Sequence, residues 1–400
     1  MSRSITSRCP YQLDPTGDTH VETARLRERG EVVRVTLPGG VEAWSTTTAA
    51  AARQALADGR LSKRIEHWTD YQRGTVGEGW ALWGLVGGRG MLYQDGQDHQ
   101  RIRALVGRAF TTSRVAALAD HIRAVADDLL NHLADENGPV DLRQTFAYPL
   151  PVCVISRYLG VTDEMSDRMR GPFEALVTVR SPGEAATAMA SLRTALHELV
   201  ALRRREPDRD LVSRFILARD QDATFASDEE LVDNLLLLIS AGHETTVHLI
   251  CNAALALLQH PDMLTAVMNG THSWAAVVEE ALRYASPVRY ALMRYATEDL
   301  SIGGVQLRRG DAVIVGIAAG GYPADRADAF DLTRAGRGHH VAFGPGIHHC
   351  PGAGLARAEA EHALRAFFTR FPAARLAQEP TPLASIALQG VQSLHIHLDG

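Results

Sequence analysis

Apolar residues recur at every third or fourth position through most of the chain from Asp98 to Tyr284, which is the pattern of helices with one buried face. The segments that show it are Asp98 to Ala109, Arg114 to Asn137, Asp163 to Val179, Glu184 to Arg205 and Leu211 to Asp220. Ser227 to Glu230 then form a capping box, and no proline follows before Gln259. Because a helix rises about 1.5 Å per residue, the segment from Asp228 to Gln259 predicts one helix roughly 48 Å long.

Shorter alternating segments lie towards both ends of the chain. Glu31 to Leu37 and Val41 to Ser45 flank a Pro-Gly-Gly turn, which predicts a β-hairpin, and Ser393 to Leu398 predicts a final strand. A last helix is predicted from Pro351 to Phe371. No linker-like composition divides the chain, so we expect a mainly α fold with a smaller β region, in one domain from residue 1 to 400.

Residues 59 to 97 lack a clear period and carry seven glycines between positions 74 and 90. Three of the five tryptophans, Trp68, Trp80 and Trp83, fall in this segment. Long aromatic loops often form lids or binding sites. Two interpretations stay open: the tryptophans line a binding site, or the loop packs on its own core.

Composition and charge exclude several classes of protein. A chain of 400 residues that is 46% hydrophobic and 22% charged suits a globular protein with a large core. The net charge of −6 argues against general nucleic-acid binding and against an anionic membrane surface. We find no signal-peptide pattern, no apolar stretch near the roughly 20 residues of a membrane span, and no cysteine spacing of a disulfide framework. We therefore expect a cytoplasmic protein with reduced thiols.

The ten residues from Phe343 to Gly352 carry the most specific chemistry, Phe-Gly-Pro-Gly-Ile-His-His-Cys-Pro-Gly. Cys350 stands at the predicted start of a helix, where the macrodipole favours a thiolate, and thiolate is one axial ligand of haem iron. The glycines let backbone approach a flat ligand. A buried free cysteine is the alternative. Zinc is disfavoured, because no second cluster with metal-binding spacing accompanies His348, His349 and Cys350.

This segment resembles the Phe-Gly-x-Gly-x-His-x-Cys-x-Gly signature of the cytochrome P450 family, and three further family segments follow the expected order. The resemblance covers nearly the whole chain and is strongest to soluble bacterial members. It implies a P450-like fold with a long central helix over haem b. It also implies Cys350 as the iron ligand, with Phe343, Gly344, His348 and Gly352 around the cofactor.

The second matching segment, Ala241-Gly-His-Glu-Thr-Thr246, lies in the middle of the long predicted helix. Glycine in a helix costs about 1 kcal/mol relative to alanine, and threonine hydroxyls can bend helices. A purely structural kink is the alternative. By resemblance to the family's Ala-Gly-x-Glu-Thr-Thr stretch, the helix opens there for O2. The same resemblance makes Thr245 and Glu244 the catalytic residues, with Thr245 beside O2 and Glu244 in the proton supply.

Two further sets of residues follow from the resemblance. Glu280 and Arg283 match the family's Glu-x-x-Arg pair, and Arg334 is the candidate third member of a structural network, although an exposed pair is the default for this spacing. The expected partners of the haem propionates are His99, Arg103, Arg294 and His348.

The substrate pocket is predicted from strand alternation. Side chains two and four positions before Arg294 should share its face, which directs Leu292 and Tyr290 to the haem side. A twist or bulge that buries Tyr290 in the core is the alternative. The other expected walls are Trp68, Trp80, Trp83, Leu237, Leu238, Ala241 and the turn from Leu388 to Val391. Such a pocket is largely apolar and suits a bulky, weakly polar substrate.

The sequence thus predicts a haem-thiolate monooxygenase that uses O2 and two external electrons to hydroxylate a bulky, largely apolar small molecule of secondary metabolism. No flavin or iron–sulfur motif is present, so a separate ferredoxin and ferredoxin reductase are the expected partners. Arg101, Arg108 and Arg357 are candidates to meet an acidic partner. Two alternatives stay open: oxidative C–C or C–N coupling of an aromatic substrate such as a cyclic dipeptide, and a non-enzymatic haem sensor.

Overall fold

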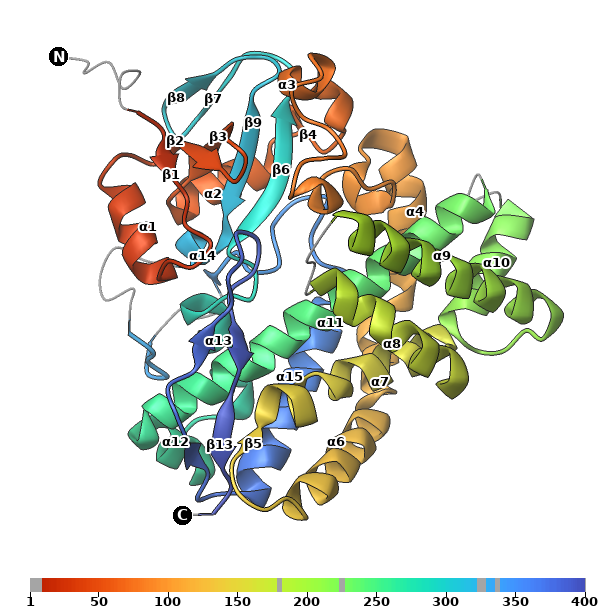
Figure 1. Cartoon of the computed structure of the whole chain (residues 1–400), viewed down its shortest axis with the longest axis vertical. Helices are drawn as coiled ribbons and strands as arrows, with labels where there is room; N and C mark the ends of the chain where they lie inside the picture. Colours follow the sequence, from red (N-terminus) through yellow and green to blue (C-terminus); the bar gives the residue numbers. More distant parts are fainter. Residues whose placement is uncertain (1–8, 178–181, 223–226, 322–328, 335–338, 400) are drawn as a thin grey trace.

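The computed structural model describes residues 9–177, 182–222, 227–321, 329–334 and 339–399. A sheet with its flanking short helices occupies one part of the molecule, and long helices form the rest (Figure 1). This arrangement agrees with the predicted mainly α fold with a smaller β region. Among the described residues, no helix combines the length and apolar character needed to span a membrane.

The principal sheet has six strands in the order β1-β2-β3-β9-β6-β4. Their bounds are Tyr11–Gln12, Val32–Leu37, Val41–Thr46, Ala312–Gly316, Tyr290–Ala296 and Leu61–Ser62, in that order. The hairpin of β2 and β3 is confirmed, and its turn places Gly39 and Gly40 at φ of 85° and 78°, where glycine is favoured. β9 runs parallel to β3 and antiparallel to β6, which puts strands from both ends of the chain side by side.

The remaining strands form small sheets. β10 (Arg375–Leu376), β13 (His395–His397) and β5 (Val140–Asp141) make one, β11 (Thr381–Pro382) pairs β12 (Val391–Ser393), and β7 (Leu300–Ile302) pairs β8 (Val305–Leu307). The prediction of one strand from Ser393 to Leu398 was wrong in its extent. β12 and β13 pair with different strands, so the ladder breaks at Leu394.

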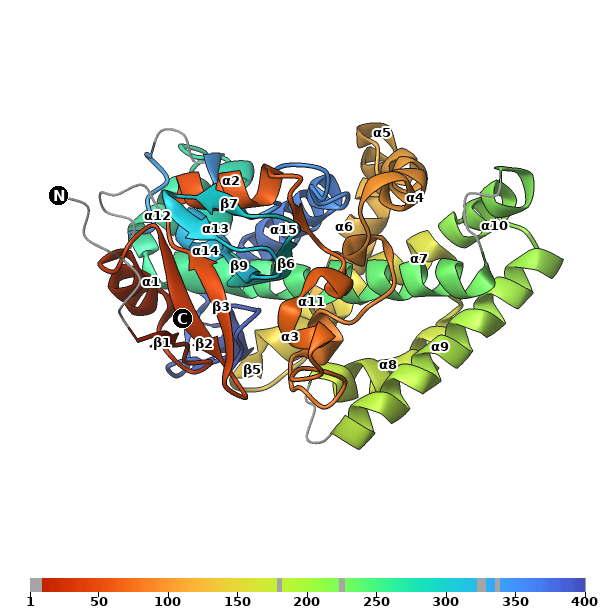
Figure 2. The same ribbon diagram turned by 90° about the horizontal axis from the view of Figure 1, so that it is seen from above.

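The longest helix, α11 (Asp228–Gln259), has the predicted bounds. Ser227 Oγ accepts a hydrogen bond from the Glu230 amide at 3.1 Å, as expected of a capping residue. The helix runs through the middle of the molecule, from the neighbourhood of α12 (Pro261–Met268) to that of α10 (Leu211–Asp222) (Figure 2). Nearly its whole second half is buried, so α11 is a central element rather than an amphipathic surface helix.

The other long helices pack around α11. They are α4 (Gly96–Ala109), α6 (Ala119–Ala134), α7 (Pro149–Leu159), α8 (Asp163–Val177), α9 (Pro182–Arg205), α13 (Trp274–Tyr284) and α15 (Ala353–Arg370). Shorter helices are α1 (Thr19–Arg27), α2 (Ala49–Ala57), α3 (Thr69–Gln72), α5 (Thr112–Ala116) and α14 (Ile317–Gly320). Single turns are η2 (Ile65–His67), η3 (Trp83–Leu85) and η4 (Met91–Tyr93), and η5 (Arg143–Ala147) is a π-helical turn.

Several predicted helices differ in their bounds. The segment from Arg114 to Asn137 is two helices, α5 and α6, and the last two residues of the segment from Asp163 to Val179 lie outside the described residues. α7 was missed because Pro149 and Pro151 stand in its first turn, where proline is tolerated. α15 begins at Ala353, so Pro351 lies in the turn before the helix rather than in its first position.

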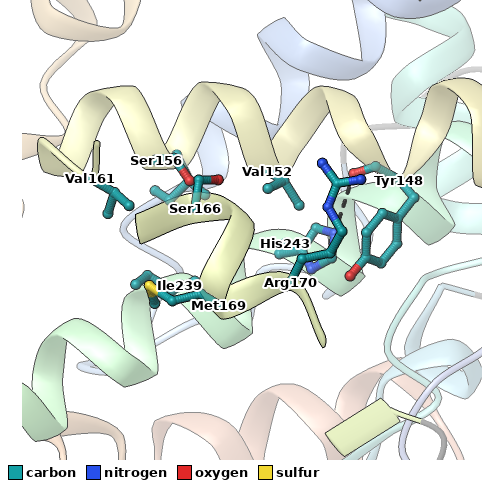
Figure 3. Close-up of a pocket in the computed structure, with 10 residues that line it drawn as sticks. Tyr148, Val152, Ser156, Val161, Ser166, Met169, Arg170, Ile239 and His243 are labelled. Carbon is teal, nitrogen blue, oxygen red and sulfur yellow. Dashed lines mark hydrogen bonds between the residues drawn. The ribbon is translucent and has the colours of Figure 1, made fainter. Parts of the chain in front are cut away.

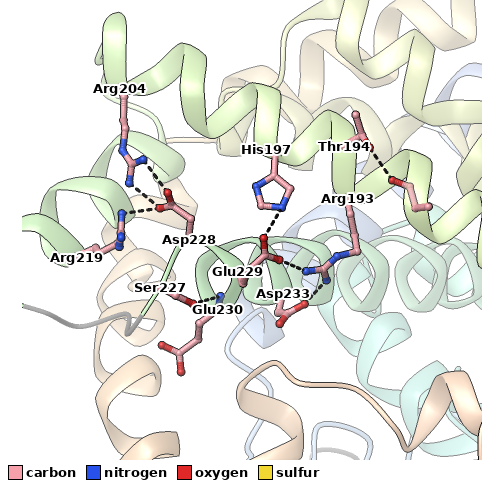
Figure 4. Close-up of polar contacts among 11 residues, drawn as sticks. Arg193, Thr194, His197, Arg204, Arg219, Ser227, Asp228, Glu229, Glu230 and Asp233 are labelled. Carbon is pink, nitrogen blue, oxygen red and sulfur yellow. Dashed lines mark hydrogen bonds and ion pairs between the residues drawn. The ribbon is translucent and has the colours of Figure 1, made fainter.

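Ion pairs join α9 and α10 to the first turns of α11 (Figure 4). Asp228 contacts Arg204 and Arg219, each at 2.6 Å, and Arg193 contacts both Glu229 and Asp233. Acidic residues in a first turn also complement the helix dipole. The pairs are mostly half-exposed, so each contributes no more than about 1 kcal/mol.

Candidate active site

The loop before α15 is fixed by backbone contacts. The Cys350 amide donates to the carbonyl of Phe343 at 2.9 Å, and Gly344 and Gly346 have φ of 65° and 91°. A Cβ on Gly346 would lie 2.8 Å from the carbonyl oxygen of Leu56. Gly346 is therefore required for the loop to approach α2 and its neighbours, and not only for the approach of a flat ligand.

The Cys350 thiol lies in a mixed environment. Burial raises its pKa, while the Gly352 amide and the charges of Arg103 and Arg357 lower it, and the net pKa is raised. Burial thus outweighs the helix-end effect expected from the sequence. A bound metal cation deprotonates a coordinating thiol, so iron held by Cys350 would stabilise the thiolate more than the protein alone does.

The middle turn of α11 is open on one face. Ser240, Ala241 and Gly242 are exposed, although the residues on either side are buried. The helix stays α-helical, and Thr245 Oγ1 donates to the carbonyl of Ala241 at 2.7 Å, one turn back. The hydroxyl is thus held beside the exposed turn, where a ligand over this face would meet it.

Glu244 is buried at the edge of this face. Its carboxylate lies 3.1 Å from Arg143 of η5 and 3.8 Å from His248. Burial raises the pKa of Glu244, and the Arg143 charge and hydrogen bond oppose that rise. Arg143 was not predicted as a partner of Glu244.

All four expected propionate partners occur within one region. The His99 and His348 rings lie 4.4 Å apart, and burial lowers the pKa of His99 to about 4. Arg294 is 7% exposed and donates to the carbonyl of Leu61 at 3.4 Å. Burial also lowers the pKa of Arg103, whose charge acts on Cys350.

Lys63 joins this group and was missed in the sequence. It follows the short strand β4, is 6% exposed, and its Nζ donates to the carbonyl of Leu292 at 2.8 Å. Burial and the charge of Arg294 lower its pKa to about 7. Spacing along the chain gives no signal for Lys63, because its partner lies on the distant strand β6.

These residues fit the carboxylates of a haem. Lys63, Arg103 and Arg294 are cationic types, and the Nδ1 atom of His99 has no hydrogen-bond partner among the described residues. The carboxylate nearby, Asp95, already accepts from Ser62 and from the Lys63 amide. Buried cations in excess of buried carboxylates indicate a ligand with more than one negative charge.

The Glu280 network has the expected geometry. Glu280 is fully buried and contacts Arg283 through two hydrogen bonds of 2.7 and 2.9 Å. Arg334 Nε lies 3.9 Å from Glu280, which also accepts from the Asp331 amide at 2.9 Å. The contacts join α13 to the segment before the Cys350 loop, in keeping with a structural role.

Two of the three tryptophans pack against the sheet or its hairpin turn. Trp68 is 1% exposed and stacks on Tyr295, with ring centroids 5.3 Å apart. The Trp80 indole donates to the carbonyl of Pro38 at 2.7 Å and packs at the hairpin turn. The loop therefore packs largely on the sheet. Trp83 is half-buried and stacks on Tyr71.

The structure also places Tyr290 differently from the prediction. β6 contains a bulge between Ala291 and Arg294, so Tyr290 and Arg294 do not share a face. The Tyr290 ring is buried and its hydroxyl donates to Glu22 at 2.9 Å. Leu292, within the bulge, is 7% exposed.

The remaining expected pocket residues differ in exposure. Leu238 is buried, Leu237 and Leu388 are half-buried, and Ala241 is exposed. Leu237 contacts Gly90 of the long loop, so this side of α11 meets the segment that carries Trp83. Two of the arginines expected to meet a partner are already engaged, Arg101 with Glu230 and Arg357 with Glu279.

A small pocket lies between α7, α8 and α11 (Figure 3). Ile239 and His243 line it from α11, with Tyr148 and Arg170 among the facing residues. Successive helical residues are turned by about 100°, so His243 points nearly opposite to Ala241 and Thr245. This pocket is thus behind the helix relative to the exposed turn.

Comparisons with known proteins identify the family. The cytochrome P450 family model matches residues 186–273 and 274–391. The chain is 40% identical over 404 residues to 2-hydroxy-5-methyl-1-naphthoate 7-hydroxylase of Streptomyces carzinostaticus, with 98% of each chain covered. It is 37% identical to the P450 monooxygenase PikC of Streptomyces venezuelae, covering 96% of this chain and 92% of PikC.

Solved structures agree with the sequence relatives. CYP154C4 from Streptomyces sp. W2061 superposes with a TM-score of 0.92 at 39% identity, covering 98% of both chains. The tirandamycin C-bound monooxygenase TamI superposes with a TM-score of 0.88 at 35% identity, covering 98% of this chain and 100% of TamI. The chain belongs to the bacterial cytochrome P450s, haem-thiolate monooxygenases that use O2.

Proposed function

We propose that this P450 hydroxylates a bulky, carbon-rich small molecule of secondary metabolism, with Cys350 as the axial thiolate. The observation that carries the assignment is a set of cationic residues close to the Cys350 loop, the buried Lys63 and Arg294 and the half-buried Arg103. When bound, haem supplies the redox chemistry that activates O2 with two electrons. His99 and His348 complete the donors for its carboxylates.

The apolar residues around the open turn of α11 support this substrate class. Ala241, Leu237, Leu238, Leu292 and Leu388 offer no charge to a substrate, and Trp83 adds a half-buried ring. Relatives include hydroxylases of 6-deoxyerythronolide B and of vitamin D(3), both large and weakly polar molecules. Shape and apolar contact, with few hydrogen bonds, orient such substrates.

Thr245 and Glu244 are the residues we assign to proton handling. Thr245 presents a hydroxyl at the open turn, and Glu244 is a buried acid one residue away. A hydroxyl beside the reacting oxygen can hold and pass a proton, and a nearby carboxyl can replenish it. This pair favours an enzyme over a haem sensor, which has no need of proton delivery.

Oxidative coupling is the second candidate reaction. The P450 CxnD, which forms a C–S bond in chuangxinmycin biosynthesis, superposes on this chain with a TM-score of 0.89 at 31% identity. The fold therefore accommodates coupling as well as hydroxylation. Both reactions begin from the same site and differ in what the substrate radical meets next.

Electrons come, on this proposal, from a separate ferredoxin and its reductase in the cytoplasm. The chain carries no motif for flavin or an iron–sulfur cluster. Arg101 and Arg357 contact acidic residues of the chain itself, so the exposed Arg108 is the better candidate of the three for docking.

The test combines a spectrum with a product mass. The reduced carbon-monoxide complex should show the red-shifted Soret band of a thiolate-ligated haem, and Cys350→Ala should abolish it. With a surrogate ferredoxin system and polyketide, steroid and aromatic dipeptide candidates, hydroxylation adds one oxygen atom to the product, whereas coupling removes two hydrogens. An unchanged band in Cys350→Ala would refute the ligand assignment.

A further inference from the structure

Glu244 has a cationic partner from a different part of the chain. Arg143 Nη2 lies 3.1 Å from Glu244 Oε1 and 3.4 Å from Oε2, and both side chains are at least nine-tenths buried. Arg143 is the first residue of the π-helical turn η5, which joins β5 to α7 and packs against α11. A π-helical turn is rare and frequently occurs at functional sites.

The other groups around Glu244 do not replace Arg143. His248, one turn along α11, is fully buried, and burial lowers its pKa to about 3. His243, at the pocket behind the helix, has its pKa lowered to about 4 by burial. Both rings are therefore neutral near pH 7. Asp141, the nearest acid on β5, accepts hydrogen bonds from the Arg143 and Leu394 amides.

His248 is kept close by a glycine. A Cβ on Gly390 would lie 2.1 Å from His248 Nδ1, so only glycine fits there without movement. Neither ring nitrogen of His248 has a hydrogen-bond partner among the described residues. The neutral His248 ring thus fills space beside the Glu244 carboxylate without a charge, and Arg143 is the charged partner of that carboxylate.

The position of Glu244 on α11 indicates what this ion pair does. Glu244 is turned by about 100° from Thr245 and by the same angle, in the other sense, from His243. Its carboxylate therefore lies at the edge of α11, between the open turn and the pocket of Figure 3. Arg143 Cζ lies 5.9 Å from the ring centroid of Tyr148, which lines that pocket. The backbone carbonyl of Tyr148 accepts a hydrogen bond from His243 Nε2 at 3.3 Å.

We propose that Arg143 is a positioning residue for Glu244: it holds the carboxylate ionised at the edge of α11, so that Glu244 must leave this contact or gain a proton before it serves Thr245. The inference rests on the proposed role of Glu244 in proton supply. An ionised, paired carboxylate is a proton acceptor from solvent rather than a donor. Loss of Arg143 leaves burial unopposed, which favours the neutral acid.

The experiment reads the protonation of Glu244 directly. Infrared difference spectra of the holoenzyme are recorded across a pH titration, and Glu244→Gln assigns the carboxylic-acid band. We expect no Glu244 acid band at pH 7 in the wild type. In Arg143→Gln the midpoint of the band should move to higher pH by about one unit or more, the usual effect of losing an adjacent opposite charge.

Two variants control for structural damage. Arg143→Lys keeps a positive charge at this position and should leave the midpoint closer to the wild type than Arg143→Gln does. Arg289→Gln removes a similarly buried arginine that pairs with Glu22 of α1 at 2.7 Å rather than with Glu244, and should not change the midpoint. The carbon-monoxide spectrum checks that each variant holds haem.

The outcomes separate this inference from the proposed function. An acid band of Glu244 at pH 7 in the wild type, or an unchanged midpoint in Arg143→Gln, would overturn the role of Arg143. The first measurement needs no Arg143 variant and stands even if Arg143→Gln does not fold. The proposed function is tested separately: if Glu244→Gln releases no more hydrogen peroxide per electron pair than the wild type, Glu244 is not in the proton supply.

Discussion

Lys63 is the side chain whose surroundings depart furthest from what its residue type prefers. A lysine ammonium is strongly hydrated, yet this one is 6% exposed and its described partner is a carbonyl oxygen. Burial and the charge of Arg294 lower the pKa of Lys63 from 10.5 to about 7 in the folded protein. Between pH 7 and pH 10.5 the unfolded chain therefore binds more protons than the folded one. Without a carboxylate ligand, the charge on Lys63 therefore lowers the free energy of unfolding, and this loss reaches its maximum below pH 7.

Lys63→Met should accordingly act in opposite directions on the two forms of the protein. The haem-free protein should gain thermal stability at pH 7, because a buried charge is removed. The haem complex should lose haem about tenfold faster, since a hydrogen bond to a charged group contributes about 1.5 kcal/mol. Haem transfer to a scavenger protein measures the rate, and Arg64→Met, a half-exposed neighbour, is the control. A haem-free form destabilised by the change would contradict the assignment.

Thr245→Ala should separate electron use from product formation. The variant should keep the carbon-monoxide spectrum and substrate binding, because the hydroxyl contacts only the Ala241 carbonyl among the described residues. It should release several-fold more hydrogen peroxide per electron pair consumed. Thr246→Ala is the control, because the Thr246 hydroxyl donates in the same way to the carbonyl of Gly242 but is buried and turned by about 100° from Thr245. Equal peroxide from both variants would remove Thr245 from the mechanism.

At this scale, the sequence indicated residues that belong to local motifs and missed residues that do not. Cys350, Glu244 and Thr245 stand in short patterns with family-specific spacing. Lys63 and Arg143 have no such pattern, because each reaches its partner from a distant segment. Their importance depends on burial and on the strand or turn packed opposite, which spacing along the chain does not encode.

At the scale of elements, helices with a strong apolar period were predicted well and breaks in regular pairing were not. α11 has its predicted bounds because a capping box and a proline mark its ends. The bulge in β6 reverses the face of Tyr290, and no residue in Tyr290–Ala296 signals the extra position. A bulge depends on the partner strand, here β9, and is therefore a tertiary property.

Gly346→Ala should destabilise the fold through the Cys350 loop. Alanine at φ of 91° is strained, and its Cβ would lie 2.8 Å from the Leu56 carbonyl. We expect a loss of about 1–3 kcal/mol in the free energy of unfolding, measured by chemical denaturation. Gly107→Ala, in open space within α4, should be neutral or slightly stabilising. Equal stability of both variants would show that the loop relaxes without cost.

At the scale of the whole molecule, the residues expected to contact haem come from both parts of the fold. Arg294 belongs to strand β6 of the sheet and Lys63 follows strand β4, whereas His99 and Arg103 belong to α4 and Cys350 to the loop before α15. A cofactor held by the strands, by α4 and by the Cys350 loop joins elements that are distant in sequence. The distribution explains why helix patterns alone indicated the fold class but not the residues that meet at the site.

Removal of haem should therefore lower the melting temperature of the whole protein. A ligand that binds only the folded state at about a thousandfold excess over its Kd adds roughly 4 kcal/mol of stability. Calorimetry of the haem-free and reconstituted protein measures the change, which should affect the sheet and the helices in one transition. A haem-free protein with an unchanged melting temperature would place the cofactor outside the cooperative unit.

The ion pairs of Figure 4 have a consequence for how samples of this protein are handled. α9 is joined to α11 partly by half-exposed charges, Arg193 and Arg204 facing Asp228, Glu229 and Asp233. Mobile ions screen such charges over about 10 Å at 0.1 M salt and over about 3 Å at 1 M. Buffer ionic strength thus sets how firmly the two helices are joined, and preparations made at different salt concentrations need not have the same mobility in this region.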